Sequence, residues 1–73
     1  MTMNEYAKSR GLRASHISQK IGITRQALEQ YGKVYMPTVK SLEKVANAMT
    51  ELGAPTTVVD LVVALYENKR KEN

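Results

Sequence analysis

Apolar residues recur three and four positions apart along most of the chain, which is the spacing of one face of an α-helix. The longest such stripe follows Thr38, whose hydroxyl can cap the helix that carries it. Gly53 and Pro55 come directly after the stripe and end it. This segment therefore predicts an amphipathic helix. The stripe consists of Val39, Leu42, Val45, Ala46, Met49 and Leu52.

The beginning of the chain predicts a shorter helix with defined ends. Thr2 and Glu5 have the spacing of a capping box, so a helix can start at residue 3. It should run to about Arg10, and Gly11 can take the left-handed conformation that ends it. Tyr6 is the residue of this helix that we expect in the core.

Two further short helices are expected on either side of Gly22. The first covers about residues 14–21, and Ile17 and Ile21 share one of its faces. Gly22 ends it, because glycine tolerates a positive φ. Thr24 can then cap the next helix by accepting a hydrogen bond from a backbone N–H two or three residues further on.

The helix after Thr24 should divide its side chains between two faces. Leu28 and Tyr31 lie three residues apart and are expected to face inward. Two short helices joined by a tight turn form a helix-turn-helix, which presents the start of its second helix to solvent. That geometry can place a helix end in the DNA major groove. The side chains expected to point outward are Arg25, Gln26, Glu29 and Gln30.

The last segment, "VVDLVVALYENKRK" after Thr57, is locally ambiguous. Its valines favour a strand, whereas the continuation into Ala-Leu-Tyr and a cationic end favours a helix. Thr57 and Asp60 form a variant capping box, so we predict a helix over residues 57–68. Because this helix is apolar nearly all round, one face would be exposed in a monomer, and a dimer contact is expected. The expected contact residues are Val59, Val63 and Tyr66.

Together these elements predict an all-α protein, a compact bundle of about five short helices. We place a single domain at residues 1–68 and a basic tail, expected to be flexible, at residues 69–73. A chain this short buries only about 60% of its unfolded surface, so a partner would add stability. It has no cysteine, and its longest apolar run, 61–66, is far short of the ~18 residues of a membrane span. We expect a cytoplasmic, nucleoid-associated protein and no membrane contact.

Positive charge is concentrated in the first half of the chain. The net charge is +4, and residues 1–40 carry seven Lys and Arg against two Glu. Residues 41–73 carry four against five acidic residues. This imbalance suits a polyanion such as DNA, although a solvated surface accounts for it equally well.

The outward side chains of the third predicted helix suit base recognition. Arginine can pair with O6 and N7 of guanine, and glutamine with N6 and N7 of adenine, each discriminating by ~1–3 kcal/mol. Arg25 and Gln26 take the first two helical positions, and Gln30 lies one turn on. We predict that these three residues read DNA bases; a plain solvated face is the alternative.

Residues from about 12 to 52 resemble the lambda-repressor-like family of phage repressors and Cro proteins. The resemblance lies in "ASHISQKIGITRQALEQYGK" and continues in "MPTVKSLEKVANAM". It implies a bundle of about five helices whose third helix reads bases at Arg25, Gln26 and Gln30. It also implies phosphate contacts from the loop and the start of the fourth helix. The residues at the family's structural positions are Ile17, Gly22, Ile23, Leu28 and Tyr31.

Two positions depart from the family pattern. The second helix of the family usually opens with a glutamine that grips a phosphate, but Ala14 stands there, so this contact would fall to Arg13. Ser18 replaces the usual small alanine, and a hydroxyl bonded to the preceding turn would fit. The last helix matches no family pattern. Because the 73 residues hold no additional ligand or cleavage domain, the resemblance is to a small Cro-like regulator or short repressor rather than a full-length one. The expected DNA-backbone contacts are Arg13, Thr24, Lys33, Tyr35, Thr38 and Lys40.

Several residues keep two interpretations. Glu29 could form a surface ion pair, or it could accept from cytosine N4 or orient Arg25. His16 is expected on an exposed helix face, with a phosphate contact as the second interpretation. Residues 69–71 could be a solubilising tail or a nonspecific DNA arm. The chain has no cysteine nucleophile, no glycine-rich phosphate loop and no histidine with an orienting acid, so we expect no enzyme, cofactor, metal or small-molecule ligand.

The sequence therefore predicts a transcriptional regulator that binds double-stranded DNA specifically. As a homodimer it would bind a pseudo-palindromic operator and occlude a promoter. The alternative is an antitoxin or adaptor-type interaction module built on the same bundle. A nonspecific architectural DNA binder is a third, weaker possibility.

Overall fold

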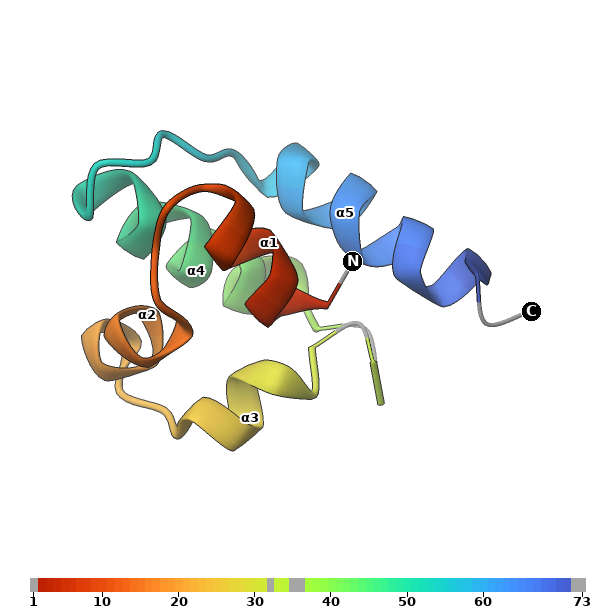
Figure 1. The fold of residues 1–73 in the computed structure, drawn as a ribbon, viewed down its shortest axis with the longest axis horizontal. Coiled ribbons are helices and arrows are strands. Elements are labelled where there is room, and N and C mark those ends of the chain that lie inside the picture. The colour runs from red at the N-terminus through yellow and green to blue at the C-terminus, as the bar shows by residue number, and fades with distance from the viewer. Residues whose placement is uncertain (1, 32, 35–36, 72–73) are drawn as a thin grey trace.

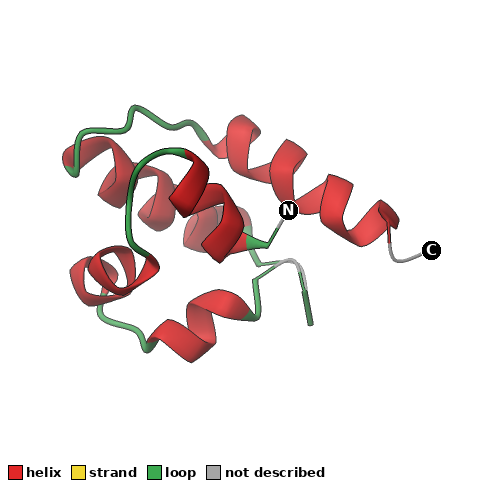
Figure 2. Ribbon diagram, in the orientation of Figure 1, coloured by secondary structure: helices red, strands yellow, loops and turns green. Residues whose placement is uncertain are grey.

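The computed structural model describes the backbone of residues 2–31, 33–34 and 37–71, with side chains as far as residue 66. Every element in this part of the chain is a helix, and the helices form a small bundle (Figures 1 and 2). The predicted all-α fold is thereby confirmed. The helices are α1 (Met3–Ser9), α2 (Ala14–Ile21), α3 (Arg25–Glu29), α4 (Val39–Glu51) and α5 (Val58–Lys71).

The core gathers around α4, which contacts both α2 and α5, while α3 contacts α1 and α2. Most of the predicted α4 stripe is buried, but Val39 is 63% exposed, contrary to expectation. Val39 begins the helix, and burial starts one turn later at Leu42, so the stripe has the right face but starts too early. The large, fully buried side chains are Met3, Ile17, Leu28, Leu42, Val45, Met49, Leu61 and Leu65.

The first helix begins as its capping box predicts. The backbone N–H of Glu5 donates to Oγ1 of Thr2 at 3.1 Å, and the N–H of Thr2 donates back to Oε1 of Glu5 at 2.9 Å. The prediction of Tyr6 as its core residue was wrong: Met3 and Ala7 are fully buried, and Tyr6 is only half-buried. Met3 and Ala7 are four residues apart and define the inner face, and Tyr6 is partly buried against the same core.

The segment between α4 and α5 is tied down by side chains. The guanidinium of Arg10 donates to the carbonyl of Pro55, and the hydroxyl of Thr50 accepts from the backbone N–H of Thr56 at 3.1 Å. Lys20 on α2 and Glu51, the last residue of α4, form an ion pair at 3.1 Å.

The ambiguous last segment is helical throughout α5. The N–H of Asp60 donates to Oγ1 of Thr57 at 3.2 Å, and the N–H of Thr57 donates to Oδ2 of Asp60 at 3.0 Å, as the variant capping box predicts. The helix continues to Lys71, so the first three residues of the predicted 69–73 tail are helical. None of the helices in the described ranges has the length and apolar character needed to cross a membrane.

Candidate nucleic-acid interface

The α2–α3 unit consists of two short helices joined by residues 22–24. The backbone of Gly22 is left-handed, with φ +80°, and its N–H and that of Ile23 both donate to the carbonyl of Ser18 at 2.9 and 3.0 Å. Thr24 follows in extended conformation, and its Oγ1 accepts from the N–H of Ala27 at 3.0 Å, which starts α3 at Arg25. Both ends of the turn are therefore set by local hydrogen bonds.

The unit is anchored from behind by apolar side chains. Ile17 and Leu28 are fully buried, Tyr31 is buried, and Ile21 and Ile23 are partly buried against the same core. Ser18 is also buried, and its hydroxyl donates to the carbonyl of Ser15 at 3.0 Å, as expected of a hydroxyl bonded to the preceding turn. These contacts hold α3 against α2.

The three residues predicted to read bases are exposed. Arg25 and Gln26 form the first turn of α3, and Gln30 follows the last residue of the helix. Figure 1 shows α3 along one edge of the bundle, with the other helices on its inner side. Long hydrogen-bonding side chains thus lie on an outer surface backed by a packed core.

Glu29 does not point outward as predicted. Its side chain is half-buried, and Oε1 accepts a hydrogen bond from Nδ2 of Asn4 on α1. Its partner is therefore an amide of the protein rather than a surface cation. No local pattern predicts this contact, because the two residues are 25 positions apart.

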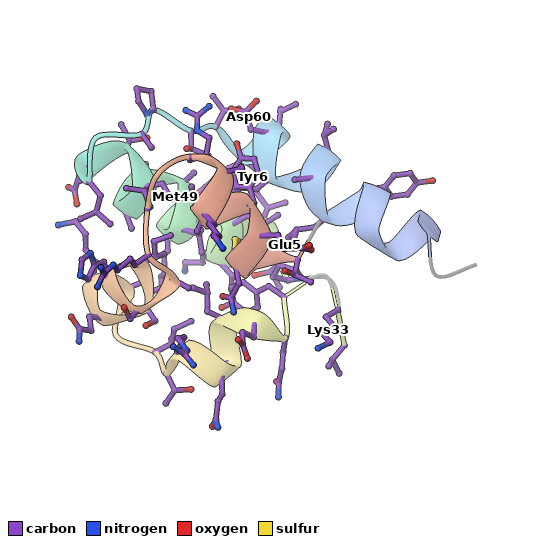
Figure 3. The ribbon with its side chains drawn as sticks, viewed as in Figure 1. Glu5, Tyr6, Lys33, Met49 and Asp60 are labelled. Carbon is purple, nitrogen blue, oxygen red and sulfur yellow. The ribbon has the colours of Figure 1, made fainter. Side chains whose placement is uncertain are left out.

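Most of the predicted DNA-backbone residues are exposed: Arg13, Thr24, Lys33, Thr38 and Lys40. Lys33 follows α3 in a turn, well away from Asp60 at the start of α5 (Figure 3). The hydroxyl of Thr38 accepts from the N–H of Ser41 at 3.2 Å, so it caps α4 as predicted. Tyr35 lies outside the described residues.

An open pocket of about 510 Å³ lies where α1 meets the starts of α2 and α3. It brings Arg13 and Arg25 together with Lys8, a cation on α1 that is not among the residues predicted to contact DNA. Arg13 occupies the N-cap of α2 without a side-chain capping bond. Three cations and a helix start therefore share one depression. Its complete lining is Asn4, Lys8, Leu12, Arg13, Ala14, Ser15 and Arg25.

The outer face of α5 is apolar, as expected for this helix. Val59, Val63 and Tyr66 are 69%, 53% and 58% exposed, and Val62 beside them is also exposed. The opposite face carries the buried residues Leu61 and Leu65.

Within the described ranges, no group of three or more His, Cys, Asp or Glu side chains is placed to hold a metal ion. His16 is exposed on α2, as expected. Comparisons with protein-family models, with curated proteins and with solved structures gave no significant match to this chain.

Proposed function

We propose that the protein is a sequence-specific DNA-binding regulator and that α2 and α3 act as its helix-turn-helix. The observation that carries the proposal is the outer surface of α3, where Arg25, Gln26 and Gln30 are all exposed. Arginine and glutamine are the side chains that pair bidentately with guanine and adenine in the major groove. Buried Ile17 and Leu28 hold the helix behind them, so the reading side chains have a rigid support.

Phosphate contacts would come from residues on either side of α3 in the chain. Arg13 precedes it, Lys33 and Lys40 follow it, and all three are exposed. Ion pairs with phosphates fix the register of a protein on DNA but carry no sequence information. The mechanism we propose is occlusion, in which a dimer covers a promoter through two reading helices about 34 Å apart.

The decisive experiment is selection of bound duplexes from a random pool. We expect an enriched, pseudo-palindromic sequence with half-sites about one helical turn apart. A salt titration on the selected site should then show log K falling with log salt by roughly 0.9 per phosphate neutralised. A pool without enrichment, although the protein binds duplex DNA, would instead favour a nonspecific architectural binder.

The second candidate function is an antitoxin or adaptor-type interaction module. The exposed apolar face of α5, around Val59 and Val63, is the observation that favours it, because such a face can bind another protein. No affinity for duplex DNA at low salt would support this alternative over the regulator.

A further inference from the structure

Apolar packing holds α3 against the bundle, but the helix has only five residues, and Leu28 is the buried residue within it. Because apolar contacts are non-directional, they fix the position of so short a helix better than the direction of its outward side chains. A polar contact at the side of α3 therefore has a large influence on where its outward side chains point.

Asn4 on α1 provides such a contact. Its Nδ2 donates to Oε1 of Glu29, the last residue of α3, in a partly buried position. The opposite amide orientation would place Oδ1 against the carboxylate oxygen, and two acceptors repel each other. The amide therefore turns its N–H₂ to Glu29, and this leaves Oδ1 buried without a hydrogen-bond partner.

Arg25 brings hydrogen-bond donors to the pocket that Asn4 lines. Asn4 and Arg25 line the same pocket, and Arg25 lies four residues before Glu29, in the same row along α3. Gln26 and Gln30 form the neighbouring row. A guanidinium carries five N–H donors, whereas Oδ1 of Asn4 needs one.

We propose that Asn4 is a positioning residue for the recognition helix. Its amide N–H₂ holds the carboxylate of Glu29 toward α1, and its unpaired Oδ1 offers the guanidinium of Arg25 an acceptor in the pocket that both residues line. Together these contacts set the rotation of α3, keep the negative charge of Glu29 away from DNA phosphates and aim the arginine at its base. The inference rests on the proposed function, and it adds a residue outside the α2–α3 unit to the specificity of that unit.

The test compares selected-sequence profiles of Asn4→Ala with those of two matched variants. Arg25→Ala should remove the sequence preference at one base pair. At that same base pair, Asn4→Ala should lower the preference for the selected base about tenfold, which is the size of one lost bidentate pair. The preference assigned to Gln30 should stay within about twofold. Glu29→Gln keeps an acceptor for Asn4 and should retain the wild-type profile.

Lys8→Ala is the second matched variant, since Lys8 lies on the same helix and lines the same pocket. It should weaken binding to all sequences equally. If Asn4→Ala also weakens all sequences equally, Asn4 only stabilises the fold and the proposal is overturned. Should Asn4→Ala fail to fold, Asn4→Leu, of similar volume and without polar atoms, should give the same loss at the base pair of Arg25.

A measurement without DNA separates this inference from the proposed function. In ¹⁵N spectra of the free protein, Asn4→Ala should shift the Nε–H resonance of Arg25, and Glu29→Ala should shift the side-chain amide resonances of Asn4. An Arg25 resonance that is unmoved in folded Asn4→Ala would overturn the network even where DNA binding is established. If these resonances shift as expected but the protein binds no duplex DNA, the proposed function is overturned. Asn4 then has no role in DNA recognition either.

Discussion

At the scale of single residues, Arg25 and Lys40 should make two different kinds of DNA contact. Both are exposed, but Arg25 starts α3 and Lys40 lies in the first turn of α4. We expect Arg25→Ala to relax the preference at one base pair by ~1–3 kcal/mol and Lys40→Ala to lower affinity uniformly across sequences. Binding titrations against the selected site and its single-base variants measure both effects. An unchanged preference profile for Arg25→Ala would remove Arg25 from the reading residues.

Asp60 should make stability depend on pH. The pKa of its carboxyl is lowered mainly because the backbone N–H of Thr57 donates to it; the Thr57 hydroxyl and the positive charge of Arg10 add to this effect. A folded-state pKa below the unfolded value of ~3.9 means that the contact stabilises the fold above that pH. The stabilisation is lost as the pH falls through the folded-state pKa.

We therefore expect Asp60→Ala to have a lower Tm than the wild type at pH 7, with a difference that shrinks as the pH falls below about 4. Thermal unfolding followed by circular dichroism measures it. Glu43→Ala, at an exposed position on α4, is the control and should differ little from the wild type at either pH. A Tm difference for Asp60→Ala that persists unchanged to pH 2 would contradict this interpretation.

At the scale of elements, the turn between α2 and α3 depends on the backbone conformation of Gly22. A Cβ added there would meet no atom within 4 Å, so a substitution costs conformational energy and causes no clash. We expect Gly22→Ala to lower the free energy of unfolding by about 1–2 kcal/mol, the cost of a left-handed conformation for an L-residue. Gly22→Asn should cost less, because asparagine visits that region more readily.

Urea denaturation of the two variants measures this difference. Equal losses for alanine and asparagine would mean that the left-handed conformation is not what Gly22 contributes. A Gly22→Ala protein as stable as the wild type would mean that the turn can change its conformation at no cost.

The starts of four helices were predictable from the sequence because local chemistry sets them. Thr2, Thr24, Thr38 and Thr57 each cap a helix with a partner three residues away, and Gly22 adopts its left-handed conformation without help from distant residues. Periodicity within α4 likewise predicted most of its buried face.

What the sequence missed depends on neighbours from elsewhere in the chain. Which face of α1 is buried depends on the helices that surround it, so its own sequence does not distinguish Tyr6 from the buried residues Met3 and Ala7. The spacing within α3 predicts an outward Glu29, because its partner Asn4 belongs to another helix. The pocket that joins α1 to the starts of α2 and α3 could not be anticipated for the same reason.

At the scale of the whole molecule, the exposed face of α5 bears on oligomeric state. Val59, Val62, Val63 and Tyr66 leave apolar surface in contact with water in a monomer, and a second copy would cover it. Figure 1 shows α5 and α3 at opposite edges of the view, with α1 and α4 between them. A substitution on the outer face of α5 should therefore leave the reading surface of each monomer unchanged.

We expect the wild type to sediment at twice its chain mass of 8.2 kDa and Val63→Asp to sediment as a folded monomer, because a buried, unpaired carboxylate opposes association. Val34→Asp is the matched control: Val34 is 70% exposed but lies outside α5, so this variant should remain dimeric. Leu65 is unsuitable for the test, since it is fully buried and an aspartate there would disrupt the core. The monomeric variant should bind a single half-site and a complete operator with equal affinity. The wild type should bind the complete operator more tightly. A folded Val63→Asp protein that still sediments as a dimer would place the dimer contact on another surface.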